Sequence, residues 1–118
     1  MKKTQMTLGS ILLCMASHMA FADCTYPKAP DAVPDAKSAS QAEMLAAMSE
    51  FKQYNSDVDA YVTCLDEETT AKVKDAGAAG AIMQIKAMQA KKKSAATDER
   101  QAKIEAFNKA VREFKSKG

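Results

Sequence analysis

The sequence is poor in the residues from which catalytic and metal sites are usually built. Its 118 residues include no tryptophan, one histidine and three cysteines. The histidine, His18, and one of the cysteines, Cys14, both lie within the first 22 residues. The chemistry open to the protein therefore depends on whether this segment is retained.

The first 22 residues are typical of a secretory signal peptide. Lys2 and Lys3 precede an apolar stretch centred on residues 8–15, and the small residues Ala20 and Ala22 stand where a signal peptidase cleaves. The apolar stretch is short and interrupted by polar residues, which argues against its retention as a membrane anchor. We expect residues 1–22 to be removed after Ala22 and the protein to be periplasmic or secreted.

Cleavage at this point leaves two cysteines, Cys24 and Cys64, and no histidine. The loss excludes Ser–His and Cys–His nucleophile pairs and the usual zinc ligand sets. A lipidated cysteine follows a small residue. Neither Cys14 nor Cys24 does, so we expect neither to be lipidated. An even pair of cysteines in an exported protein predicts a disulfide bond. The alternative is two free thiols.

The charges are balanced in number but not in position. The precursor has 17 basic and 15 acidic residues, so loss of Lys2 and Lys3 leaves a neutral chain. Residues 23–68 carry a net charge of −7 and residues 69–118 a net charge of +7. Opposite net charges favour a structure in which the two halves are arms that pack against each other. A basic second half could instead contact anionic lipid or nucleic acid. Export argues against a nucleic-acid partner.

All three prolines, Pro27, Pro30 and Pro34, fall in the segment DCTYPKAPDAVPDAK, residues 23–37. Proline interrupts a helix and restricts the preceding residue to extended geometry. We therefore expect residues 23–37 to form an extended strap with polyproline character, followed by a single domain over residues 38–118.

Residues 38–74 have the pattern of a helix. Ser38 with Gln41 and Ser40 with Glu43 both fit a capping box, which satisfies free amides at a helix start. A narrow stripe then recurs at alternating steps of four and three residues, in which only the asparagine and the threonine are polar. The stripe consists of Met44, Met48, Phe51, Asn55, Val58, Val62, Leu65 and Thr69.

The stretch DAGAAG, residues 75–80, predicts a turn, with Gly77 suited to the left-handed conformation. A second helix is expected over residues 81–117. Its stripe includes Ile82, Ile85, Met88, Ile104, Phe107, Val111 and Phe114. Because Thr97 could cap a new helix, one long helix and two helices broken near residues 93–98 both fit the sequence.

Equal arm lengths favour an all-α, antiparallel two-helix hairpin. Alignment about the turn places Met48 near Phe107 and Phe51 near Ile104. Cys64 would lie roughly 39 Å along the first helix, and the chain from Cys24 to residue 38 can cover at most about 43–50 Å. The strap must therefore run almost straight back along the first helix to reach Cys64.

Few residues are candidates for chemistry in this hairpin. Asp57 and Asp59 point to different sides of a helix, and residues 66–68 lack the glycine and ligand spacing of a calcium loop. We expect no catalytic residue, no metal site and no cofactor, and hence no enzymatic activity. Met44 and Met48 share one helical face and could bind copper(I), although such a pair more often belongs to a core or a contact surface.

Tyr54 and Tyr61 either cover the prolines of the strap, which is the interpretation we favour, or form an exposed recognition face. The lysine run at residues 91–93, with Lys86, could contact anionic lipid or polysaccharide. The candidate interaction surface consists of Met44, Met48, Tyr54, Tyr61, Lys91, Lys92 and Lys93.

The segments CTYPKAPDAVPDAKSASQAEMLAAM and YVTCLDEE resemble a family of small, uncharacterised, exported helical proteins of Gram-negative bacteria. In that family a Cys-Thr-Tyr-Pro start, a serine-rich helix cap and a second cysteine recur. The resemblance covers residues 24–68 well and the second arm loosely. It implies paired cysteines, a helical hairpin and a periplasmic location, but no activity.

These features predict a non-enzymatic periplasmic interaction or structural protein whose partner is another protein. Two helices alone bury little surface, so a homodimer forming a four-helix bundle is one expected partner. The alternatives are a chaperone-like or envelope-stress binder of unfolded chains, and an envelope-surface binder that uses the basic second helix.

Overall fold

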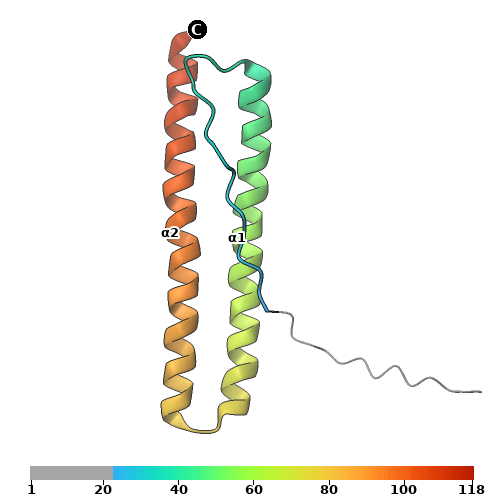
Figure 1. Ribbon diagram of the computed structural model, residues 1–118, viewed down its shortest axis with the longest axis vertical. Helices are drawn as coiled ribbons and strands as arrows, with labels where there is room; N and C mark the ends of the chain where they lie inside the picture. Colours follow the sequence, from blue (N-terminus) through green and yellow to red (C-terminus); the bar gives the residue numbers. More distant parts are fainter. Residues whose placement is uncertain (1–22) are drawn as a thin grey trace, which may run out of the picture.

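The computed structural model describes residues 23–118, which form two long helices and an extended N-terminal segment (Figure 1). Helix α1 spans Gln41–Ala76 and helix α2 spans Ala79–Lys117, and they pack against each other as an antiparallel hairpin. At 1.5 Å per residue they are about 54 and 58 Å long. The predicted all-α hairpin with a disulfide-linked strap is confirmed. The predicted signal peptide lies outside the described residues.

The strap, residues 23–37, crosses one side of the hairpin (Figure 1). It begins beside the C-terminal half of α1, where Cys24 is bonded to Cys64, and reaches the end of the hairpin opposite the turn, near the C-terminus of α2, before the chain enters α1. It has no regular secondary structure, as its three prolines predict. The strap therefore adds a third layer to part of the molecule.

Helix α1 begins three residues later than residue 38, its expected start. Ser40 is its N-cap, and a complete capping box joins Ser40 to Glu43. The competing signal at Ser38 is used differently, because the carboxylate of Asp35 accepts hydrogen bonds from the Ser38 hydroxyl and the Lys37 amide. Asp35 thus closes a separate turn that leads from the strap into the helix.

The buried stripe of α1 differs from the expected stripe in every second position. The buried residues are Met44, Ala47, Phe51, Tyr54, Val58, Tyr61, Leu65 and Glu68. Asn55 is exposed, and Met48, Val62 and Thr69 are only half-buried. The strap explains the difference, because it covers the side of α1 that carries Tyr54 and Tyr61 and so extends the buried face in that direction.

Helix α2 is one continuous helix, with no break near residues 93–98. The Thr97 hydroxyl donates to the carbonyls of Lys93 and Ser94 in the preceding turn instead of capping a new helix. Ala96, completely buried in the same segment, lets the two helices approach closely. The single-helix alternative is therefore the correct one.

One contact between the helices differs in detail from the expected pairing. Phe51 stacks on Phe107, with ring centroids 4.5 Å apart, whereas the arm-length alignment paired Phe51 with Ile104. Ile104 packs at the edge of the same cluster. Met48, Phe51, Ile104 and Phe107 thus meet in one cluster, as the alignment placed them, and the stacked pair is Phe51 with Phe107.

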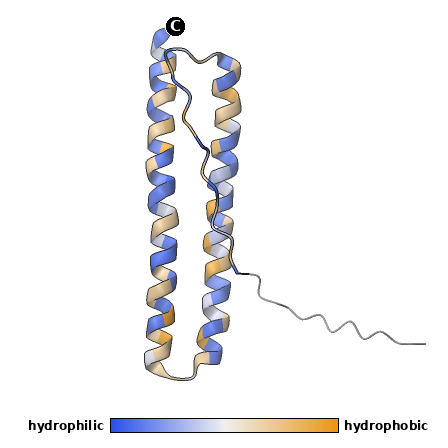
Figure 2. Cartoon of the chain, in the orientation of Figure 1, coloured by the Kyte–Doolittle hydropathy of each residue, from blue (hydrophilic) through white to orange (hydrophobic). Residues whose placement is uncertain are grey.

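Burial divides the hairpin into two halves. The buried apolar side chains of the helices lie within residues 44–65 and 96–110, and we call this part, with the strap, the strapped half. Residues 66–95, around the turn, contain no buried apolar side chain, and we call them the open half. Figure 2 shows that apolar residues nevertheless continue along both helices toward the turn. The open half thus has apolar residues but no closed core.

Candidate interaction surface

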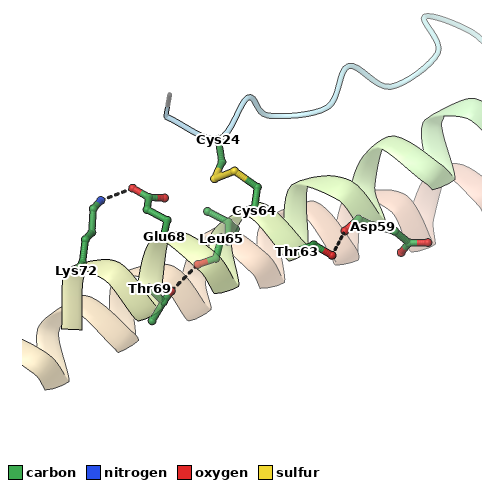
Figure 3. The surroundings of a disulfide bond; sticks show 8 residues. All are labelled: Cys24, Asp59, Thr63, Cys64, Leu65, Glu68, Thr69 and Lys72. Carbon is green, nitrogen blue, oxygen red and sulfur yellow. Dashed lines mark hydrogen bonds and ion pairs between the residues drawn. A yellow bond between two sulfur atoms is a disulfide. The ribbon is translucent and has the colours of Figure 1, made fainter. Parts of the chain in front are cut away.

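The disulfide between Cys24 and Cys64 is formed, with the two Cα atoms 5.8 Å apart and a sequence separation of 40 residues (Figure 3). It fixes the first residues of the strap to α1 at the boundary between the strapped and open halves. The predicted pairing is confirmed, and the alternative of two free thiols is wrong.

Tyr54 and Tyr61 lie beneath the strap, and only 2% and 7% of their surfaces are exposed. The ring of Tyr26 meets that of Tyr61 edge-on, with centroids 5.3 Å apart, and Pro27 is buried beside them. Burial raises the pKa of the Tyr54 hydroxyl. The two α1 tyrosines therefore belong to the interior of the strapped half and do not form an exposed recognition face.

Tyr26 joins the strap to α2 as well as to α1. Its hydroxyl donates a hydrogen bond of 2.6 Å to the Glu99 carboxylate. This bond, with smaller contributions from burial and from the charge of Glu99, raises the pKa of Tyr26 to about 12. Sequence reasoning did not find this contact, because the two residues are 73 positions apart and neither belongs to an apolar pattern.

A second polar contact holds the other end of the strap. The Lys117 ammonium donates to the backbone carbonyls of Ala36, Lys37 and Ala39, at 3.2, 3.0 and 3.4 Å. It also lies 5.2 Å from the centre of the Phe114 ring. The last turn of α2 therefore fastens the turn through which the strap enters α1, another contact that the sequence did not indicate.

Met44 and Met48 both belong to the core of the strapped half, at the end of the hairpin opposite the turn. Met44 is buried, and Met48 packs against the cluster that contains Phe51 and Phe107. A buried thioether in an apolar cluster is a packing group. The burial of Met44 therefore fits the core interpretation of this pair better than an exposed contact surface.

The lysine run does not form one exposed patch. Lys91 is exposed, whereas Lys92 and Lys93 are half-buried, and Lys93 forms an ion pair with Asp66 of α1. Arg100 pairs in the same way with Asp59. In these pairs, basic side chains of α2 contact acidic side chains of α1, as the opposite charges of the two arms predict. Lys86 and Lys91 are separate exposed charges.

A cavity of about 290 Å³ lies beside Asp23 and Cys24, at the N-terminal end of the strap. Its lining residues are Asp23, Cys24, Cys64, Glu67, Glu68, Ala71, Lys72 and Asp75. Figure 3 shows Glu68 and Lys72 extending from α1 beyond the disulfide and paired with each other. The hydrogen bond from Lys72 lowers the pKa of Glu68. None of the lining residues except the cysteines was a predicted site residue.

The interface between the helices becomes polar beside this cavity. Glu68 and Gln89 are the buried residues of the open half, with 8% and 3% of their surfaces exposed. The Gln89 carboxamide faces Glu68 and, after Lys72, contributes to lowering the pKa of that carboxyl. A polar layer at this position replaces the apolar layers of the strapped half and weakens the packing of the two helices toward the turn.

Residues 23–118 contain no group of three or more histidine, cysteine, aspartate or glutamate side chains placed to hold a metal ion. Within the same residues, neither helix has a segment long and apolar enough to cross a membrane.

Comparison with known proteins gives no independent indication of function. A scan against protein-family models found no match, and searches of the curated proteins and of the solved structures found none either. Function therefore has to be argued from the geometry of the strapped and open halves.

Proposed function

We propose that this protein is a non-enzymatic interaction protein of the periplasm or the extracellular space, and that it binds another protein through its open half. The observation that carries the proposal is the difference in burial between the two halves. In the strapped half the strap covers the apolar side of the hairpin, whereas in the open half nothing in residues 23–118 covers it.

The exposed apolar side chains of the open half support this proposal. Met88 and Met83 are 59% and 72% exposed, and Ile82 and Ile85 are half-buried. Helices of this length in water normally depend on tertiary packing of an apolar face. A surface that offers flexible methionines beside a partly formed core is suited to packing against another protein.

The two alternative functions receive less support. A chaperone-like binder would need an exposed methionine and tyrosine surface, but Met44, Tyr54 and Tyr61 of the candidate interaction surface are buried. An envelope-surface binder was expected to use the lysine run, in which Lys93 is paired with Asp66. The open half remains the part of residues 23–118 in which apolar side chains of the helices are least covered.

Site-specific photo-crosslinking in intact cells tests the proposal. The photoreactive residue p-benzoyl-phenylalanine would replace Met88 in the open half or, as a matched control, Leu45 in the strapped half. The two positions are 59% and 57% exposed, so access to the probe is nearly equal. We expect irradiation to give protein–protein products from position 88 and at least several-fold less product from position 45.

Equal yields from the two positions would contradict the proposal, as would the absence of any product from position 88. Far-UV circular dichroism of both purified variants would show that the hairpin is intact. A product with the mass of two chains would identify the partner as a second copy.

A further inference from the structure

The strap itself shows what kind of ligand one side of α1 accepts. Beside the first residues of the strap, a concavity is lined by Tyr26, Pro27 and Lys28 from the strap and by Asp57, Ala60, Tyr61 and Cys64 from α1. The strap is an extended segment that packs an aromatic ring and a proline on this face, while its Lys28 pairs with Asp31 of the strap itself. It can therefore be treated as a bound peptide that belongs to the same chain.

The cavity at the N-terminal end of the strap lies on the same face of α1, seven residues further toward the turn. Adding seven to positions 57, 60, 61 and 64 gives 64, 67, 68 and 71, all four of which line the cavity. Residues seven apart are two helical turns apart and share a face. The groove occupied by the strap thus continues into the open half, with Asp23 and Cys24 at its entrance.

The lining of this continuation is strongly acidic. Asp23, Glu67, Glu68 and Asp75 contribute four carboxylates, and Lys72 contributes one cation, which is paired with Glu68. The other three carboxylates form no ion pair within residues 23–118. Cleavage after Ala22 would add the α-ammonium group of Asp23 and leave a net charge of −2. Charge complementarity therefore selects a basic ligand.

The size of the groove selects an extended segment over a second copy of the hairpin. From Cys64 to the turn at Gly77 the face is about 20 Å long, which matches about six residues of extended chain. A strip of this length and about 10 Å wide offers about 200 Å², well below the roughly 600 Å² per partner at the lower end of stable interfaces. A short peptide needs no more than this strip.

We propose that the acidic groove beyond the disulfide binds an extended, lysine- or arginine-containing segment of about six residues from another protein, lying in line with the strap. This proposal rests on the proposed function, since it specifies the partner of the open half. Small apolar residues or proline between the basic residues would pack against Ala71, as Tyr26 and Pro27 of the strap pack against Tyr61.

Fluorescence anisotropy with the oxidised protein tests this binding. The probe is a fluorescein-labelled peptide of sequence Ala-Lys-Pro-Ala-Lys-Pro-Ala, and the control is the same peptide with glutamate in place of lysine. We expect saturable binding of the lysine peptide only. Because the groove is exposed, raising the ionic strength should weaken this binding by several-fold.

Matched variants locate the peptide on the protein. Glu67→Lys and Asp75→Lys reverse charges in the groove, and Glu105→Lys makes the same change on an exposed residue of α2 in the strapped half. We expect each groove variant to weaken binding by about tenfold at low salt, and the Glu105 variant to bind like the wild type. Ala71→Phe should also abolish binding by filling the cavity, with unchanged helicity as the check on folding.

Three results would overturn the inference: equal binding of the glutamate peptide, no binding of the lysine peptide, and equal losses from Glu67→Lys and Glu105→Lys. Crosslinking from position 88 without binding of the lysine peptide would reject this ligand class while leaving the proposed function in place. Absence of both would reject both.

Discussion

At the scale of single residues, a few side chains determine where the strap lies. Tyr26 contacts α1 through Tyr61 and α2 through Glu99, and Lys117 holds the turn that follows the strap. The sequence revealed the cysteine pair, because pairing follows from cysteine number and compartment alone. It could not reveal the partners of Tyr26 and Lys117, because these depend on a register that no local pattern specifies.

The Tyr26–Glu99 contact predicts a pH dependence at alkaline pH. The folded protein favours the neutral hydroxyl, because a phenolate cannot donate to Glu99 and is repelled by its charge. Since the pKa of Tyr26 rises from 10.0 to about 12, the stabilisation is complete below pH 10 and is lost as the pH rises from 10 to 12. Tyr26→Phe should lower the free energy of unfolding by about 0.5–1 kcal/mol at neutral pH, because the bond is partly exposed to solvent.

Urea unfolding of the wild type and of Tyr26→Phe at pH about 8 and about 11.5 measures this effect. The difference in stability between the two proteins should shrink at the higher pH, and comparing the proteins cancels the titration of the lysines. A difference that is constant with pH would show that the hydroxyl contributes nothing through Glu99.

At the scale of elements, the connection between the helices contains only Gly77 and Ala78. Gly77 has a φ of 66°, and the amide of Ala78 donates to the carbonyl of Ala76 across it at 2.7 Å. Glycine at this position was predictable, because it tolerates positive φ, although a ψ of −35° lies outside the left-handed conformation that was expected. The existence of both helices was predictable for a similar reason, since capping and periodicity are local signals.

Which side of α1 is buried was less predictable than the existence of the helix. Tyr54 and Asn55 are neighbours, and the periodicity of α1 alone fits either position into the stripe. The strap decides in favour of Tyr54, because it supplies apolar contacts on that side. The buried face thus depends on a segment far away in the sequence, which explains why half of the expected stripe was wrong.

Two glycines near the turn provide a matched test of backbone conformation. Gly77→Ala should destabilise the protein by about 1–3 kcal/mol, because positive φ strains a residue with a Cβ atom. Gly80→Ala should stabilise it by about 0.4–1 kcal/mol, because Gly80 is helical and loses more entropy on folding than alanine does. No atom lies within 4 Å of a Cβ atom built at either position, so steric contact does not confuse the comparison.

Thermal unfolding followed by circular dichroism distinguishes the two variants. The melting temperature should fall for Gly77→Ala and rise for Gly80→Ala. Shifts of the same sign would mean that the turn does not require glycine at position 77.

At the scale of the whole molecule, the protein is a three-layered unit at one end and a bare pair of helices at the other. The strapped half combines two core clusters, the strap and the disulfide. The open half has a polar layer at Glu68 and Gln89 and no buried apolar residue. The hairpin and the reach of the strap to Cys64 could be predicted from the sequence, but this division of burial could not, because it depends on which side of α1 the strap covers.

The disulfide should contribute much of the stability of this unit. Replacing Cys24 and Cys64 together by serine should lower the free energy of unfolding by about 4 kcal/mol, the loop-closure entropy for about 40 residues. Both helices should largely persist, while trypsin should cut the released strap at Lys28 far faster than in the oxidised protein. Unchanged stability together with unchanged protection of Lys28 would show that the strap is held without the covalent bond.

The position of the disulfide also determines how the molecule would respond to tension. A force applied between Asp23 and Gly118 passes from Cys24 directly to Cys64, so the loop between the two cysteines carries no load. Only residues 64–118 can be drawn out, which limits the extension to about 190 Å, compared with about 340 Å for the whole of residues 23–118. Under such a pull α2 would be stripped from α1 from its C-terminal end, while the N-terminal part of α1 and the strap would remain a closed, unstretched ring.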